Sequence, residues 1–359
     1  MSDFIARRTF ISYHRYIVFV IILFSTNLNV FAQGLGMGTE DEPITRWPTA
    51  DPLEMGLDTT ALNEHAELCV ASAATGCLVI YKGHVVQEWK SSDHDFGPYL
   101  GTASATKSIT ALLVGMLIAD GKIGGVDDLV SDYIPEWKAG SDSMVTIEQL
   151  LTMSAGLDRL SPPRSVLAAK DMTAFVIDRP ITQSPGTRWI YSNEGAQLLS
   201  PILEAAAEMP LAAYARERLF GPLGMFWSHF YVDEYYNTVT YGGMETTLTE
   251  FARIGQLILN NGQWNGIQIL EPEWIEAMST SSSTNPGYGY LWWLIERHNA
   301  IAAAGDGDRI LTIFPGKDLV AVRSQRIASV PGTYTETYFN DRGRMHAKAA
   351  DILARVVPE

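Results

Sequence analysis

The sequence predicts an α/β (α+β) fold, in which helices flank one antiparallel sheet and a mostly helical lobe is inserted in the middle of the chain. Strand-like runs occur near both ends, within residues 76–89 and 288–324. Residues 122–245 instead hold short helical stretches, many prolines and no long strand pattern. Runs of strands that are separated from runs of helices favour antiparallel pairing over βαβ units. The two ends of the chain are therefore expected to build one sheet together.

The N-terminal residues have the composition of an export signal. Three arginines precede a short apolar run from Tyr16 to Phe24, and Val30-Phe31-Ala32 fits a small-x-small cleavage site. The apolar run is too short to span a bilayer. We therefore expect residues 1–32 to be a signal peptide and the mature protein to be periplasmic or secreted. Retention of this segment would instead anchor the protein to a membrane.

The rest of the chain is expected to form a single domain over 55–359, preceded by a connecting segment, 33–54, which is rich in Gly, Pro and Asp. Within the domain, residues 55–121 and 246–359 are expected to form the α/β lobe, and residues 122–245 the mostly helical lobe.

Four elements are predicted before the inserted lobe. A helical pattern covers residues 59–73, with Thr59 or Thr60 as its N-cap. Two strand-like runs follow, joined by a hairpin turn at Lys82-Gly83, and an apolar helix then ends at Asp120-Gly121. The two strands and this second helix are expected at 76–81, 85–89 and 106–119.

After the lobe, two helices lead into a second group of strands, and a helix closes the chain. The turn Pro315-Gly316-Lys317-Asp318 is expected to link the last two strands. In chain order, these elements are expected at 251–259, 273–278, 288–295, 301–304, 309–314, 319–324 and 346–357.

Composition excludes several classes of function. The formal net charge is −15, and an acidic surface repels phosphate backbones, so no nucleic-acid partner is expected. The chain has no HExxH, paired CxxC or Walker pattern, so no metal and no cofactor are expected. An exported protein can oxidise Cys69 and Cys77 to a disulfide, but we favour the interpretation that they are separate, buried, small apolar side chains. The oligomeric state is left open.

Ser104 and Lys107 are the first candidate catalytic pair. They lie three residues apart at the start of the predicted apolar helix, so their side chains share one face. A serine hydroxyl is a poor nucleophile until a neighbouring group takes its proton. A lysine in the positive field of a helix N-terminus loses its own proton more readily and can be that base. The alternative is a capping serine beside a solvated lysine.

Tyr191 and Asn193 form the second candidate pair, in the sequence Tyr191-Ser192-Asn193. A tyrosine beside an ammonium group can relay protons to a leaving group. Asn193 can donate to a substrate carbonyl or orient the lysine. Taken alone, Tyr191 would be a buried tyrosine with a satisfied hydroxyl, but together with Ser104 and Lys107 we favour a functional role.

SxxK followed by YxN resembles the signature of the serine β-lactamase and penicillin-binding superfamily. The YxN form resembles the class C branch, which includes D,D-peptidases and carboxylesterases. The resemblance covers most of residues 45–355 and implies a β-lactamase/transpeptidase-like fold. Four further stretches support it, and two of them, residues 262–266 and 287–293, are similar to the nylon-oligomer (6-aminohexanoate-dimer) hydrolases. The supporting stretches are Leu150-Leu151-Thr152-Met153-Ser154-Ala155-Gly156-Leu157, Phe220-Gly221-Pro222-Leu223-Gly224-Met225, Gly262-Gln263-Trp264-Asn265-Gly266 and Gly287-Tyr288-Gly289-Tyr290-Leu291-Trp292-Trp293.

The third motif of this superfamily is altered here. It usually reads Lys-Thr-Gly or His-x-Gly, whereas the matching place reads Ala302-Ala303-Ala304-Gly305-Asp306-Gly307. The glycine, Gly305, would let the backbone approach the substrate. The resemblance implies that the backbone N–H groups of Ser104 and Asp306 form the oxyanion hole. Loss of the cation, which would hold a substrate carboxylate, disfavours penicillin hydrolysis and favours a neutral ester or amide. A carboxylate facing a developing oxyanion is unfavourable, so either the Asp306 side chain points away or the activity is reduced.

The sequence therefore predicts a serine hydrolase that forms an acyl-enzyme at Ser104 and acts on a small ester or amide. Trp189, Trp292 and Trp293 could line the acyl pocket, and Trp189 and Trp293 are the candidate site residues, although a core position is expected for all but one of the three. D,D-peptidase or β-lactamase activity is one alternative, and a non-catalytic sensor or scaffold is another. A Ser-His-Asp triad is disfavoured because no GxSxG elbow is present.

Overall fold

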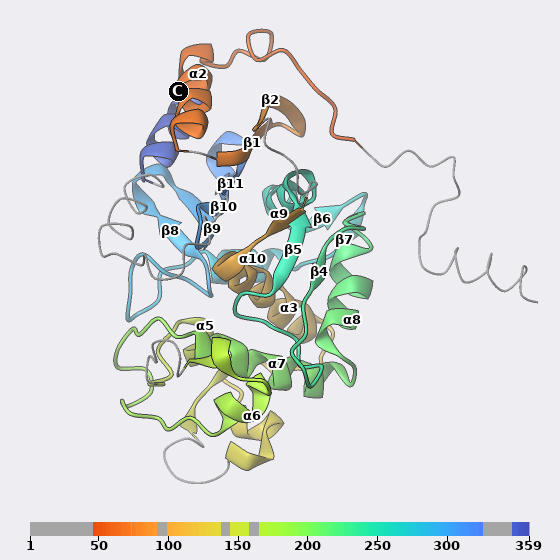
Figure 1. Cartoon of the computed structure of the whole chain (residues 1–359), viewed down its shortest axis with the longest axis vertical. Coiled ribbons are helices and arrows are strands. Elements are labelled where there is room, and N and C mark those ends of the chain that lie inside the picture. The colour runs from red at the N-terminus through yellow and green to blue at the C-terminus, as the bar shows by residue number, and fades with distance from the viewer. Residues whose placement is uncertain are drawn as a thin grey trace, which may run out of the picture. The chain divides into compact units, whose positions relative to one another are not determined.

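The computed structural model describes residues 46–72, 74–91, 99–137, 144–157, 165–325 and 347–358. The predicted signal peptide, residues 1–32, lies outside the described residues. Residues from Trp47 to Glu359 form one compact unit, which Figure 1 shows with its elements labelled.

The main sheet has six strands in the order β2-β1-β11-β10-β9-β8, and every neighbouring pair is antiparallel. Strands from both ends of the chain meet at its centre, where Ile80 of β1 lies opposite Val320 of β11. The predicted mixed α/β architecture with an antiparallel sheet is therefore confirmed. The strands are β1 (Ala74–Tyr81), β2 (His84–Lys90), β8 (Trp293–Ile295), β9 (Ala300–Gly305), β10 (Arg309–Phe314) and β11 (Leu319–Gln325).

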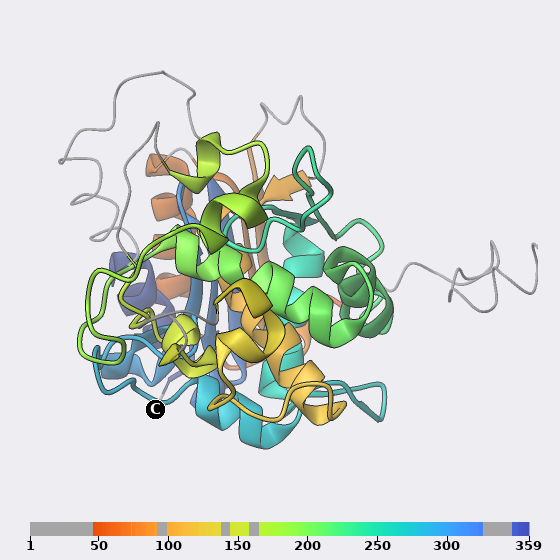
Figure 2. The ribbon, with the colours of Figure 1, turned by 90° about the horizontal axis from the view of Figure 1, so that it is seen from below.

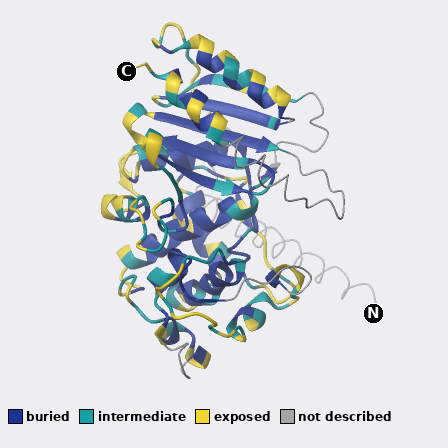
Figure 3. Ribbon diagram, turned by 90° about the vertical axis from the view of Figure 1, so that its left-hand side faces the viewer, coloured by how far each residue is buried: buried dark blue, intermediate teal, exposed yellow. Residues whose placement is uncertain are grey.

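Helices line both faces of this sheet, which explains why its central strands are buried at almost every position rather than alternating. On one face, Val79 and Ala321 pack in a cluster with residues of α2 (Thr59–Ala71) and of the helix over 347–356. On the other face, Ile80 and Val320 pack with α9 (Leu248–Leu259) and α3 (Thr106–Ala119). Figure 3 shows the sheet as a buried layer between these helices.

Helix α3 matches its predicted bounds, and all but its last two residues are buried. A helix that is apolar on every side belongs inside a protein. The helices of the middle part of the chain lie together in Figures 1 and 2, on the side of α3 away from α2. These and the later helix are α4 (Val130–Tyr133), α5 (Ile147–Leu151), α6 (Met172–Ile177), α7 (Asn193–Ala207), α8 (Leu211–Ala215) and α10 (Pro272–Met278).

Three short strands form a second sheet, β3-β5-β4, next to the start of α3. Strand β3 leads directly into a 3₁₀ turn, η1, and then into α3, so the second sheet fixes where that helix begins. A two-stranded hairpin, β6-β7, follows α9. These elements are β3 (Tyr99–Gly101), η1 (Ala103–Ala105), β4 (His229–Phe230), β5 (Met244–Thr247), β6 (Gln263–Trp264) and β7 (Ile267–Gln268).

Three local predictions are wrong. The N-cap of α2 is Asp58, whose carboxylate accepts from the N–H groups of Thr60 and Ala61, rather than either threonine. The strand expected over 288–295 shortens to β8, because the left-handed backbone of Leu291 (φ +58°) turns the chain away from the sheet. Helix α7 is 15 residues long and continues through Pro201, although only short helices were expected in that stretch.

The interpretation of the two cysteines is also wrong. Cys69 at the end of α2 and Cys77 in β1 are both fully buried, and they are joined in a disulfide. The helix packs against β1 and brings the two Cα atoms to 6.5 Å, a separation that a disulfide spans. Among the described residues, no helix has both the length and the apolar character that a membrane crossing requires.

Candidate active site

Ser104 lies in the turn η1, between β3 and α3. The residue before it, Ala103, has a left-handed backbone (φ +48°), which is rare for a residue with a side chain. Hydrogen bonds hold this turn. Thr102 N–H donates to Met244 O at 2.8 Å, and Thr106 Oγ1 donates to Ala103 O at 2.6 Å. The second sheet and the first turn of α3 therefore hold the serine in a fixed, locally strained position.

Lys107 lies one turn later and is almost fully buried, with 1% of its surface exposed. Its Nζ donates to Ser104 Oγ at 3.0 Å and to Tyr241 O at 2.7 Å. Burial lowers the pKa of Lys107, whereas interactions with the Tyr191 side chain and the negative charge of Glu194 oppose this effect. The predicted contact between Ser104 and Lys107 is therefore present, and the lysine is in surroundings that disfavour its charged form.

Tyr191 and Asn193 lie on either side of Ser192, at the start of α7. Ser192 is the N-cap of this helix, since its hydroxyl accepts from Gly195 N–H at 2.9 Å. The Lys107 Nζ lies 5.0 Å from the centre of the Tyr191 ring. Asn193 Oδ1 is buried and has no hydrogen-bond partner among the described residues. The structure thus brings Tyr191 beside the Ser104–Lys107 pair, but it shows no contact from Asn193 to the lysine.

Two residues of the site are missed by sequence reasoning. The Tyr241 backbone carbonyl accepts from Lys107, and its ring centre lies 5.5 Å from the Nζ. Burial raises the pKa of Tyr241 to about 12, and the charge of Glu194 adds to the effect. A backbone contact leaves no signal in the sequence, so Tyr241 could not have been found.

Glu194 could have been found. Its side chain is 1% exposed and accepts from Val166 N–H and from Ser192 Oγ–H, each at 3.3 Å. It directly follows Tyr191-Ser192-Asn193 and precedes the apolar part of α7, so its charged side chain stands out in the sequence. A carboxylate in such a position places negative charge close to Lys107.

Aromatic rings line one side of the site. Trp293 stacks on Tyr191 with ring centres 6.2 Å apart, and Trp189 contacts both rings at 6.1 Å. Trp189 and Trp293 are half-buried, whereas Trp292 is fully buried in the core. Tyr288 packs behind them at 4.9 Å from Trp293, and burial raises its pKa. Two of the tryptophans therefore lie next to Tyr191, and the third is a core residue.

Gly305 ends β9 directly against the turn that carries Ser104. A Cβ atom added to Gly305 would lie 2.1 Å from Thr102 O and 3.1 Å from Ser104 N. A glycine is therefore required for this close approach. The contact brings the altered third motif to the nucleophile, as the resemblance implied.

Asp306 follows Gly305 and is half-buried. Burial raises the pKa of Asp306, and the charge of Asp308 adds to this, whereas the Gly307 N–H and the charge of Arg309 lower it. Asp308 makes a buried ion pair with Arg323, in which Arg323 Nη2 and Asp308 Oδ2 are 3.0 Å apart. The charge near Asp306 is therefore offset in part by Arg309.

The described residues offer one group of three metal-ligand side chains, His65, Cys69 and Cys77. The two sulfur atoms form the disulfide, so they are not thiolate ligands in this state. His65 Nδ1 is 2.6 Å from Gln87 Oε1, which ties the ring to β2. This group lies on the far side of β1 from α9, away from Ser104.

The β-lactamase family model matches residues 88–335, which is more than half of the chain. A solved structure from Bacillus anthracis, named "Putative 6-aminohexanoate-dimer hydrolase", superposes with a TM-score of 0.72 at 21% identity, over 88% of this chain and 89% of that one. At this identity the likeness shows the fold, which is β-lactamase/transpeptidase-like as predicted.

Curated relatives are similar over shorter stretches. Esterase EstB of Burkholderia gladioli is 33% identical over 34% of this chain and 36% of its own length. Beta-lactamase-like protein 2 of Dictyostelium discoideum is 28% identical over 51% of this chain and 33% of its own length. The matched part thus spans about a third of the length of these relatives. On the family match and the shared fold, the chain belongs to the β-lactamase family of hydrolases.

Proposed function

We propose that the protein is a serine hydrolase that cleaves a small ester or amide through an acyl-enzyme at Ser104. The observation that carries this proposal is the 3.0 Å hydrogen bond between Lys107 Nζ and Ser104 Oγ in a buried site. A lysine removes a proton from serine only while it is neutral. Burial, which lowers the pKa of Lys107, increases the neutral fraction at a given pH.

In the acylation step, Ser104 Oγ bonds to the substrate carbonyl carbon, and its proton passes to Lys107 Nζ. The carbonyl π electrons move onto oxygen, which accepts from the backbone N–H groups of Ser104 and Asp306. One such donor is worth roughly 3–4 kcal/mol in other hydrolases. The carbon–oxygen or carbon–nitrogen bond to the leaving group then breaks, and Tyr191 delivers a proton to the departing alcohol or amine. Lys107 passes the proton that it took from Ser104 to Tyr191, so the lysine is neutral again before deacylation.

In the deacylation step, water attacks the acyl carbon and gives its proton to the same lysine and tyrosine. The bond from the acyl carbon to Ser104 Oγ breaks, and the serine regains a proton from these groups. The products are a carboxylic acid and the alcohol or amine released earlier. The free enzyme is restored with no other reactant consumed than water.

Two features favour a neutral substrate. The alanines at 302–304 supply no cation to hold a substrate carboxylate, and Asp306 adds a carboxylate at the end of β9. The half-buried Trp189 and Trp293 offer flat apolar surface beside Tyr191, which suits an apolar acyl or alkoxy group. The similarity to an esterase supports the same choice. We therefore rank esters above β-lactams and D,D-peptides, whose carboxylates would lack a partner.

We also propose that the protein works outside the cytoplasm. The Cys69–Cys77 disulfide supports this, since such bonds persist mainly in oxidising compartments. The basic and apolar composition of residues 1–32 supports it independently. Cell fractionation of the full-length chain, with N-terminal sequencing of the mature form, tests this part of the proposal. Recovery of the intact N-terminus in the cytosolic fraction would contradict it.

The test of activity uses a substrate panel and a matched inactive variant. Wild type and Ser104→Ala are assayed with short-chain p-nitrophenyl esters, nitrocefin, D-amino-acid amides and 6-aminohexanoate oligomers. The proposal expects ester turnover that is lost in Ser104→Ala and poor turnover of nitrocefin. Preferred hydrolysis of nitrocefin or of the D-amino-acid amides would favour a β-lactamase or D,D-peptidase. No turnover and no fluorophosphonate adduct in the wild type would favour a non-catalytic sensor or scaffold.

A further inference from the structure

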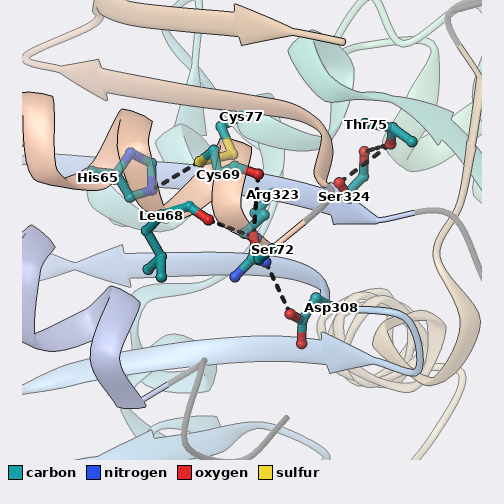
Figure 4. A network of polar contacts seen from close by, with 9 residues as sticks. All are labelled: His65, Leu68, Cys69, Ser72, Thr75, Cys77, Asp308, Arg323 and Ser324. Atoms are coloured by element: carbon teal, nitrogen blue, oxygen red, sulfur yellow. Dashed lines mark hydrogen bonds and ion pairs between the residues drawn. A yellow bond between two sulfur atoms is a disulfide. The ribbon is translucent and has the colours of Figure 1, made fainter. Parts of the chain in front are cut away.

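Arg323 of β11 forms a buried bridge between two distant segments. Its Nη2 lies 3.0 Å from Asp308 Oδ2 and also contacts Ser72 Oγ. The side chains of Arg323 and Asp308 are 5% and 2% exposed. Figure 4 shows the guanidinium between Ser72 on one side and Asp308 on the other. We call these three residues the Arg323 bridge.

The Ser72 end of the bridge is firmly held. Ser72 is the C-cap of α2, and its hydroxyl donates to Leu68 O at 2.5 Å and lies 3.2 Å from Cys69 O. The disulfide joins Cys69 to Cys77 of β1, so the end of this helix is tied covalently to the main sheet. Ser72 is 8% exposed. The position of Ser72 is therefore fixed relative to β1 by the helix end and the disulfide.

The Asp308 end is the turn between β9 and β10, which also contains Asp306. The ladder of β9 and β10 ends at the pair Gly305 and Arg309, so the residues between them depend on other contacts. Asp308 has a left-handed backbone with φ +50°, and so does Gly307 with φ +80°. Aspartate is one of the few residues other than glycine that adopt this conformation readily, so Gly307 and Asp308 suit a tight turn. Within the turn, Gly307 O accepts from Gln325 N–H at 3.1 Å.

The ion pair opposes any displacement of this turn. Movement of Asp308 away from Arg323 would separate two buried, opposite charges, which is unfavourable. The Asp306 N–H, assigned above to the oxyanion hole, belongs to the same turn, two residues before Asp308. Small displacements of an oxyanion donor weaken transition-state stabilisation, because its hydrogen bond requires close geometry.

We propose that Asp308 and Arg323 are positioning residues, whose buried ion pair holds the turn after β9 so that the Asp306 N–H meets the oxyanion. The inference rests on the proposed function, since it concerns the same reaction. Neither side chain touches the reacting atoms, and both act through the backbone of Asp306. The alternative is that the pair only stabilises the fold.

The experiment separates these roles with single and double variants. Asp308→Asn and Arg323→Met each remove one charge of the buried pair, whereas the double variant removes both charges together. Glu64→Gln is the matched control, because Glu64 pairs with Arg355 on the exposed side of the same helix α2. For each protein, kcat and KM are measured with a p-nitrophenyl ester at a temperature where unfolding curves show the folded state.

Both single variants are expected to lower the melting temperature and to reduce kcat by about 100-fold with KM little changed, as for a displacement of about 1 Å in a catalytic group. The double variant is expected to recover the melting temperature but not kcat, and Glu64→Gln to match the wild type. Recovery of both quantities in the double variant, or unchanged kcat in the single variants, would overturn the inference and leave the proposed function intact. Absence of Ser104-dependent turnover in the wild type would overturn the proposed function and the inference with it.

Discussion

Replacement of Gly305 by alanine is expected to lower kcat, because the added methyl group would push the end of β9 away from Ser104. The new Cβ would lie 2.1 Å from Thr102 O, about 1.2 Å short of an ordinary carbon–oxygen contact of about 3.3 Å. It would also lie 3.1 Å from both Ser104 N and Ala105 N. All three neighbours are backbone atoms of the turn that holds the nucleophile, so no flexible side chain can move aside. The end of β9 must therefore shift by about 1 Å relative to Ser104.

A shift of this size is expected to reduce kcat by about 100-fold, because oriented reacting groups tolerate little misplacement. The assay is steady-state ester hydrolysis by Gly305→Ala, together with its thermal unfolding curve. Gly101→Ala is the matched control, since Gly101 lies in the adjacent β3 and a Cβ there meets no atom within 4 Å. The control is expected to keep wild-type kcat. A Gly305→Ala enzyme with kcat within about twofold of wild type would refute the reasoning that this contact positions the site.

Three further predictions concern the base, its pH dependence and the disulfide. Lys107→Ala is expected to lower kcat by about 10³-fold and Tyr191→Phe by less, in steady-state assays; near-wild-type rates for Lys107→Ala would contradict its role as base. Because Lys107 must be neutral to act and burial lowers its pKa below the usual 10.5, kcat/KM should rise with pH through a midpoint below that value. Lys107→Arg, which cannot lose its proton, should be inactive at every pH, and a retained pH profile in that variant would exclude the assignment. Reduction of the Cys69–Cys77 disulfide should lower the free energy of unfolding by about 2.5 kcal/mol, because the bond closes a loop between residues eight positions apart in the unfolded chain. Denaturant titration with and without reductant measures this difference, and superimposable unfolding curves would contradict it.

The parts of the fold that local patterns determine could be predicted from the sequence. Helix α3 follows from an unbroken apolar run that Asp120-Gly121 ends, and its observed bounds match. The hairpin between β1 and β2 follows from Lys82-Gly83, both of which have the left-handed backbone that such a turn requires. The Ser104–Lys107 contact follows from helical spacing, although Ser104 itself lies in the 3₁₀ turn before α3.

The parts that depend on tertiary packing could not be predicted. The disulfide requires α2 to pack on β1, which the spacing of Cys69 and Cys77 alone does not specify. Helix α7 continues through Pro201 because packing compensates for the missing N–H, whereas proline in a sequence normally signals an interruption. The carbonyl of Tyr241 reaches Lys107 because the chain returns past α3 134 residues later. Backbone groups of this kind carry no residue-type signal.

The most direct test of the central claim is covalent labelling of the nucleophile. The purified protein is incubated with a fluorophosphonate and then examined by intact-mass and peptide mass spectrometry, with Ser104→Ala treated in parallel. The account predicts one adduct per chain, located on Ser104, with loss of ester hydrolysis in proportion to labelling and no adduct in the variant. An adduct on another residue, or full ester hydrolysis by Ser104→Ala, would contradict it.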